Sequence, residues 1–177
     1  MQIEKTKFKD LIILRSEIFK DNRGFFKEIN KKKILKKNLI FDCLSHSIKN
    51  TIRGLHFQAK KPQGKFITVV QGEILDVAVD LRKNSKTFGK TFEIVLSKEN
   101  ALGLFIPSGF AHAYYSFNEE NIIYYKLDNY YMPKFENGII YNDAELNLKW
   151  PKKNITVSKK DRKLPTFNYF CKSFGGL

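Results

Sequence analysis

Cysteines and long apolar runs are both scarce in this sequence. The 177 residues include only two cysteines, Cys43 and Cys171, with no pairing pattern. This predicts reduced thiols, a cytoplasmic location and a fold that needs no disulfide bonds. No run of 18 apolar residues occurs, so we expect no membrane span. Charges at Glu4, Lys5 and Lys7 stand where a signal peptide would have its apolar core, so we expect no signal peptide.

Histidine is almost as rare, which bears on metal binding. The three histidines are His46, His56 and His112. Metal sites on β-strands commonly use two closely spaced histidines and a carboxylate, but the residue two positions after His56 is Gln58. The sequence therefore predicts no metal site. His46 has no supporting neighbours, and we interpret it as structural.

Acidic residues are too few to balance the basic ones. Thirty-two Lys and Arg residues against 18 Asp and Glu give a net charge of +14. Such a charge favours a nucleic acid, an acidic membrane or an anionic small substrate as partner. The lysines are scattered between apolar segments, and they are not interleaved with aromatic residues as on a nucleic-acid-binding surface. We therefore expect neither nucleic acid nor membrane as partner, and a surface that steers a phosphorylated ligand.

Aromatic residues, by contrast, are plentiful at 14% of the chain, and they favour strands. A chain of this length most simply forms one domain. We expect one strand over Leu11–Phe19, a turn over residues 20–24 and a second strand over Phe25–Ile29. Asn30 is expected to cap a short helix that ends at Lys37.

From residue 40 to residue 127 the apolar residues recur with period two, which is typical of strands. Gln71-Gly72 resembles the tight turn of a hairpin. Many short antiparallel strands predict an all-β sandwich or barrel with a few short helices. We expect one domain over residues 1–170 and a loose tail over residues 171–177. The expected strands are Ile40–Ile48, Thr51–Phe57, Lys65–Val70, Glu73–Leu81, Thr91–Leu96, Leu102–Ile106, Ala111–Phe117 and Ile122–Leu127.

The stretch Thr51–Gln58 carries a cation, a base and an amide on an otherwise apolar strand. His56 and Gln58 share one face of a regular strand, whereas Arg53 points the other way unless the strand bends. Gly54 is the expected place for a bend. The three side chains together indicate a polar site inside a cavity. The alternative is one hydrogen-bonded core histidine and a surface arginine.

Two further apolar strands carry polar side chains. His112 lies on one of them, and Tyr124 and Tyr125 lie on the other, where they must face opposite sides. The inward tyrosine is either a packing residue or a proton donor. A histidine that acts as a base is usually oriented by a carboxylate. The sequence leaves open which carboxylate reaches His56, and the candidates are Asp143, Glu145 and Asp161.

An ordered set of blocks resembles the dTDP-4-dehydrorhamnose 3,5-epimerase family. The resemblance covers about residues 2–165. It implies a cupin-type jelly roll in a homodimer with an exchanged N-terminal segment. It also implies a dTDP-linked 4-keto-6-deoxyhexose as substrate, and no metal or organic cofactor. The blocks are FKDNRGFFKE from Phe19, IRGLHFQ from Ile52, QGK from Gln63, GEILDVAVDLR from Gly72, TFG from Thr87, IPSGFAH from Ile106, YK from Tyr125 with YY from Tyr130, and SKKD from Ser158.

By this resemblance His56 is the base, Tyr125 is the acid, Asp161 orients His56 and Lys65 lies near the keto oxygen. Inverting a carbon beside a ketone requires that a base and an acid flank a planar enolate, and histidine and tyrosine suit these roles. Gln58, beside His56, is also expected to bind substrate. The other positions that the resemblance assigns to substrate binding are Arg23, Glu28, Arg53, His112, Glu136 and Lys160, with Phe26 and Tyr131 against the nucleotide.

The sequence departs from the family pattern at four positions. Phe41 and Cys43 stand where Gln and Asn are usual, and Ser108 and Ala113 where Glu and Gly are common. These departures leave open which sugar is bound and whether C3 and C5 or only one centre is inverted. The alternatives are a monofunctional 3-epimerase, a cupin-type ketoisomerase, a sugar-binding protein without turnover and a nucleic-acid-binding protein.

Overall fold

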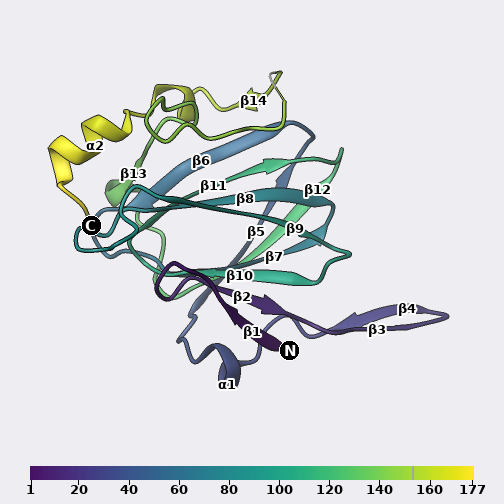
Figure 1. Ribbon diagram of the computed structural model, residues 1–177. Helices are drawn as coiled ribbons and strands as arrows, with labels where there is room; N and C mark the ends of the chain where they lie inside the picture. Colours follow the sequence, from purple (N-terminus) through teal and green to yellow (C-terminus); the bar gives the residue numbers. More distant parts are fainter. Residues whose placement is uncertain (153) are drawn as a thin grey trace.

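The computed structural model describes residues 1–152 and 154–177, and these form a sandwich of two six-stranded sheets (Figure 1). The all-β expectation is confirmed. The first sheet has the order β1 (Gln2–Lys5), β2 (Ile12–Arg15), β10 (Leu102–Ile106), β7 (Lys65–Gln71), β12 (Asn121–Leu127) and β5 (Phe41–Ser47). The second has the order β13 (Glu136–Gly138), β6 (Thr51–Gln58), β11 (Phe110–Ser116), β8 (Glu73–Asp80) and β9 (Thr91–Ser97), with β14 (Thr156–Val157) on β6.

The core follows from the period-two pattern, because alternate side chains of each strand meet between the sheets. Ile67 and Leu104 of the first sheet and Ile74 and Ala78 of the second are completely buried there. The second sheet is also covered on its outer face, where a separate apolar cluster contains residues from β6, β8, β11 and the C-terminal helix. This explains why β11 is buried at every position.

The prediction of a loose C-terminal tail is wrong. Helix α2 runs over Phe167–Phe174 and begins at Thr166, whose hydroxyl accepts a hydrogen bond from the backbone of Tyr169 at 3.2 Å. The backbone N–H of Leu177 donates to Leu81 at 2.8 Å. The sequence looked polar here because α2 is amphipathic. Its phenylalanines cover Phe57 of the second sheet, with the two nearest ring centroids at 5.3 and 5.9 Å.

The predicted hairpin at Gln71-Gly72 is also wrong. Strands β7 and β8 on either side of it pair in different sheets. Gly72 has φ = +80° and packs so tightly that a Cβ would lie 2.3 Å from the carbonyl oxygen of Glu120. The Gln-Gly pair is therefore a corner that carries the chain from one sheet to the other.

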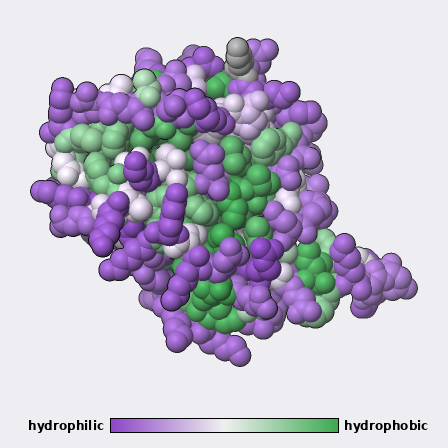
Figure 2. All heavy atoms as spheres, in the orientation of Figure 1, coloured by the Kyte–Doolittle hydropathy of each residue, from purple (hydrophilic) through white to green (hydrophobic). Residues whose placement is uncertain are grey.

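The strand expected over Leu11–Phe19 is two strands. It breaks at Ser16, whose N–H donates to Ala101 and whose hydroxyl donates to Glu28. The second part, β3 (Ile18–Asp21), pairs with β4 (Gly24–Lys27) in a hairpin that projects from the sandwich (Figure 1). Hydrophobic side chains lie on this arm between the body and the hydrophilic tip (Figure 2). They include exposed Phe19, Phe25 and Phe26.

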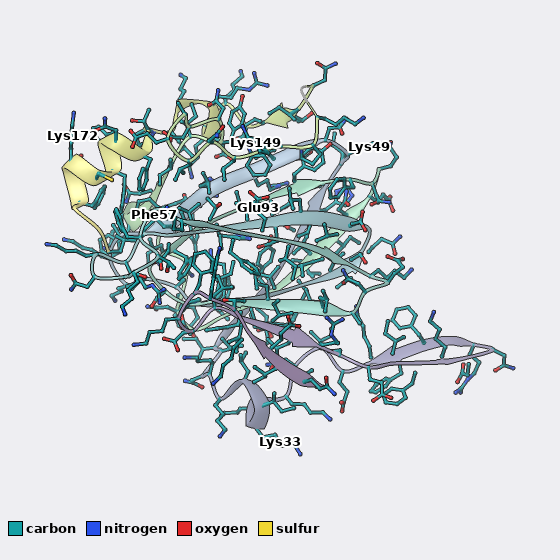
Figure 3. The ribbon with its side chains drawn as sticks, viewed as in Figure 1. Lys33, Lys49, Phe57, Glu93, Lys149 and Lys172 are labelled. Carbon is teal, nitrogen blue, oxygen red and sulfur yellow. The ribbon has the colours of Figure 1, made fainter. Side chains whose placement is uncertain are left out.

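The short helices are minor features of the fold. Helix α1 spans Lys32–Leu35, and its N-cap position is Lys31 rather than the predicted Asn30, whose side-chain oxygen has no hydrogen-bond partner among the described residues. The 3₁₀ helices η1 (Pro133–Phe135) and η2 (Asp161–Lys163) follow later in the chain. No helix of the described residues is long and apolar enough to cross a membrane. Exposed Lys33, Lys149 and Lys172 lie on separate parts of the molecule (Figure 3), in keeping with scattered positive charge.

Candidate active site

A cleft of about 690 Å³ lies between the two sheets, and this volume suits a small-molecule ligand. Strands β5, β7 and β12 of the first sheet and β6 and β11 of the second line it, together with the segment from β14 to η2. The structure brings together here seven of the residues predicted for the site: Arg53, His56, Lys65, His112, Tyr125, Lys160 and Asp161.

The predicted bend at Gly54 is confirmed, and it places a cation beside a base. His56 pairs with His112 across β6 and β11, but Arg53 pairs with Tyr114, so β6 has one extra residue between the two pairs. The extra residue brings Arg53 and His56 to the same side of the sheet. Gly54 has φ = +115°, and a Cβ would lie 2.4 Å from the carbonyl oxygen of His112, so only glycine fits.

Asp161 is the candidate carboxylate that contacts His56. The distance from His56 Nε2 to Asp161 Oδ1 is 2.9 Å, and the second carboxylate oxygen accepts the Gly54 N–H at 3.1 Å. Burial raises the pKa of Asp161, but the hydrogen bonds from His56 and Gly54 outweigh it and hold that pKa below its usual value. Asp143 instead accepts backbone N–H groups at a turn and at the start of α2. The ionised Asp161 fixes the ring of His56 and leaves the other ring nitrogen for a ligand.

Tyr125 is the inward-facing member of the tyrosine pair. It lines the cleft from β12, on the sheet opposite His56. Burial raises the pKa of Tyr125 well above its usual value, and a hydrogen bond with Ser45 lowers it by less. The phenol therefore keeps its proton at neutral pH.

His112 and Lys65 complete the floor of the cleft. His112 Nε2 lies 2.8 Å from Asp76 Oδ2, and both side chains are buried. Burial lowers the pKa of His112, and Asp76 raises it by less. The net effect favours a neutral ring. Burial likewise lowers the pKa of Lys65, and Asp76 is the largest influence that opposes it. No group of three or more His, Cys, Asp or Glu side chains among the described residues is arranged to hold a metal ion.

Glu136 joins two other predicted residues at the rim. It accepts hydrogen bonds from the Tyr131 hydroxyl at 2.7 Å and from the Lys160 ammonium group. Burial raises the pKa of Glu136, but these two donors outweigh it and lower the pKa. Gln58, in contrast, does not line the cleft. Its amide N–H donates to the carbonyl of Lys61 and its oxygen accepts from the backbone of Met132, so it holds two loops together.

The remaining three predicted residues lie on or beside the projecting hairpin, away from the cleft of their own chain. Phe26 is 65% exposed, and Arg23 donates to Asp21 at 2.7 Å. Glu28 pairs with Lys31 at 2.5 Å. A single chain therefore does not bring these side chains to the residues around His56.

Several cleft residues were missed by the sequence analysis. Ser45, Ser47 and Tyr114 all line the cleft, and their hydroxyl groups contact one another and Tyr125. The sequence pattern could have predicted them. Ser45 and Ser47 lie two positions apart on an expected strand and so share one face, and Tyr114 likewise shares a face with His112. Cys43 also lines the cleft, as a free thiol at one of the positions that depart from the family pattern.

Comparisons with known proteins identify the family of the chain. The sequence model of the dTDP-4-dehydrorhamnose 3,5-epimerase family matches residues 5–169. The enzyme of that name from Methanothermobacter thermautotrophicus is 41% identical over 166 residues, 89% of this chain and 90% of the relative. The Shigella flexneri enzyme is 40% identical over 168 residues, 91% of this chain and 93% of the relative.

Solved structures give the same result. That of the Legionella pneumophila 3,5-epimerase, in complex with dTDP-4-keto-L-rhamnose, has a TM-score of 0.90 and 37% identity, covering 94% of this chain and 93% of that one. The Bacillus anthracis enzyme, with TDP and PPi bound, has a TM-score of 0.89 and 41% identity, covering 93% and 98%. These matches confirm the expected cupin-type jelly roll. The chain is therefore an isomerase that belongs to the dTDP-4-dehydrorhamnose 3,5-epimerase family.

Proposed function

We propose that the protein inverts C3 and C5 of dTDP-4-dehydro-6-deoxy-D-glucose to give dTDP-4-dehydro-L-rhamnose. The observation that carries the proposal is that His56 and Tyr125 line one cleft from opposite sheets, with Asp161 bonded to His56. The relatives at about 40% identity bear this activity in their names, and a solved relative holds dTDP-4-keto-L-rhamnose. The cytoplasmic location belongs to the same proposal.

The mechanism follows from the acidity of a hydrogen beside a ketone. His56 removes the proton on one face of the sugar, which leaves an enolate, and Tyr125 returns a proton on the other face. General acid–base catalysis of this kind contributes about 10²–10⁴-fold. Lys65 stabilises the charge that grows on the C4 oxygen, and such preorganised donors contribute several kcal/mol more. The same pair serves C3 and C5 in turn.

The charged rim suits the diphosphate of the substrate. Arg53 and Lys160 line the cleft, and guanidinium groups match phosphate oxygens with two parallel hydrogen bonds. The excess of lysine over the whole surface attracts the same anion from a distance. Tyr131, exposed at the rim, offers a ring for the base of the nucleotide.

Incubation of the protein with dTDP-4-dehydro-6-deoxy-D-glucose in D2O tests the proposal. Deuterium is expected at both C3 and C5 without added metal, because each inversion replaces a carbon-bound proton by one from solvent. Proton NMR of the recovered sugar nucleotide measures the two sites separately. Exchange at C3 alone would assign a monofunctional 3-epimerase, and a carbonyl moved to C3 would assign a ketoisomerase. Absence of exchange with folded protein would contradict all three assignments.

We further propose that the protein works as a homodimer in which the β3–β4 hairpin reaches the partner subunit. A two-stranded ribbon is marginally stable alone, yet this one exposes three phenylalanines. Burying each ring against another chain is worth about 1.5–3 kcal/mol. The exchange would also bring Arg23, Phe26 and Glu28 to a second subunit's cleft, where the family resemblance assigns them.

Sedimentation of a Phe25→Ser/Phe26→Ser variant tests the dimer. The wild-type protein is expected to sediment as a dimer, and the variant as a folded monomer with little turnover. Tyr169→Ser is the matched control, because it removes an exposed ring of α2 far from the hairpin in sequence. A fully active monomeric wild-type protein at micromolar concentration would refute the exchange.

A further inference from the structure

A row of hydroxyl groups connects Tyr125 to a cation. The phenol oxygen of Tyr125 lies 3.3 Å from Ser45 Oγ, which lies 3.1 Å from the hydroxyl of Tyr114. That hydroxyl lies 2.8 Å from Ser47 Oγ, and Ser47 Oγ accepts a hydrogen bond from Arg53 Nε at 2.9 Å. The row crosses from β12 through β5 and β11 to β6, so it links the two sheets across the cleft.

Arg53 fixes the direction of the first bond in this row. Its Nε–H can only donate, so Ser47 accepts from it and can give its single proton to Tyr114. In that arrangement Tyr114 donates to Ser45, and Ser45 donates to the phenol oxygen of Tyr125. Within the described residues these hydroxyl groups have no other hydrogen-bond partners. The proton of Tyr125 is thereby left to point at a ligand in the cleft.

The middle of the row is buried, whereas Ser45 is half-buried and Arg53 is exposed. Ser47 is 3% exposed and Tyr114 is 2% exposed. Arg53 is anchored at its end of the row by a second bond, from Nη2 to the carbonyl oxygen of His46 at 2.8 Å. Hydrogen bonds that point the same way polarise one another, and this effect is strongest at the buried hydroxyls of Ser47 and Tyr114. Part of the charge of the exposed Arg53 therefore acts on Tyr125 through the row.

We propose that Ser47, Tyr114 and Ser45 are positioning residues that aim the Tyr125 proton at the substrate and stabilise the phenolate left after its transfer. This inference rests on the proposed role of Tyr125 as the acid. The proton moves from the Tyr125 oxygen to the sugar carbon, and the negative oxygen accepts a stronger bond from Ser45. Arg53 keeps its own proton, so the row conducts none. After each inversion His56 releases its proton to solvent and Tyr125 regains one from solvent, so both are ready for the next centre.

Tyr114→Phe is the sharpest test, because it cuts the row in the middle without touching Arg53 or Tyr125. We expect kcat to fall about 10-fold with KM nearly unchanged, as for loss of one hydrogen bond to a charged group. Tyr115→Phe is the matched control, since it removes a buried, hydrogen-bonded phenol from the same strand but outside the row. Ser47→Ala should act like Tyr114→Phe, against Ser116→Ala, whose buried hydroxyl has no partner among the described residues.

A second readout does not depend on catalysis. Difluorotyrosine is more acidic than tyrosine, so placed at position 125 it has a lower pKa than the natural phenol, and that pKa can be followed by fluorine NMR. We expect Tyr114→Phe and Ser47→Ala to raise that pKa, and the two control substitutions to leave it unchanged. If the row variants match their controls in both kcat and pKa, the inference is overturned while Tyr125 can still be the acid. If Tyr125→Phe itself inverts substrate normally, the proposed role of Tyr125 as the acid fails, whatever the pKa shifts are.

Discussion

Replacing His56 with alanine is expected to abolish deuterium exchange at both C3 and C5. Without an imidazole held by Asp161 at 2.9 Å, nothing in the proposed mechanism removes the proton beside the ketone. The loss should reach at least about 10³-fold, within the range for a positioned base. NMR of the sugar nucleotide after prolonged incubation with excess enzyme measures it.

His46→Ala is the matched control for this experiment. The bond from Arg53 uses the backbone carbonyl of His46, which alanine retains. Turnover in this variant should stay within a few-fold of wild type. Near-normal exchange in the His56 variant would show that another group is the base, and the roles of His56 and Asp161 would both have to be abandoned.

Replacing Tyr125 with phenylalanine should separate proton removal from inversion. His56 can still take a proton and return a deuteron to the same face, so exchange should continue at a reduced rate. The epimeric product should fall by about 10²–10⁴-fold, because the proton donor on the other face is gone. Comparing deuterium incorporation with product formation in one sample measures this split.

Tyr124→Phe supplies the control from the same strand. Its ring faces the opposite side of β12, and Tyr124 does not line the cleft. Inversion by this variant should match the wild type. Full inversion by the Tyr125 variant would mean that a different group delivers the second proton.

Most of the fold could be predicted from the sequence because the strands obey a simple period. The expected strands between residues 40 and 127 match the observed ones within a residue or two. The errors arose where tertiary packing decides. Sequence alone could not tell whether Gln71-Gly72 turns within one sheet or passes to the other. Nor could it show that the polar C-terminal segment forms a helix with one apolar face, because that face is recognised only by its packing on Phe57.

The site was predicted in part for the same reason. His56, Arg53 and Gly54 are neighbours in sequence, and their joint role followed from strand geometry and one glycine. The partner of His56 could not be chosen, because Asp161 is 105 residues away and reaches it only through the fold. The prediction that Gln58 binds substrate failed for the opposite reason. Gln58 shares a face with His56, but both ends of its amide are hydrogen-bonded to loop backbone.

The close approach at Gly54 also bears on how this cleft could be redesigned. The β6 wall cannot accept a side chain at position 54, because any Cβ at Gly54 collides with β11. The β5 wall is different, since β5 is the outermost strand of its sheet and has a neighbour on one side within the described residues. Cys43 lies on that wall, facing the ligand space, and is exposed. A mutant library aimed at new sugar substrates should therefore begin at position 43.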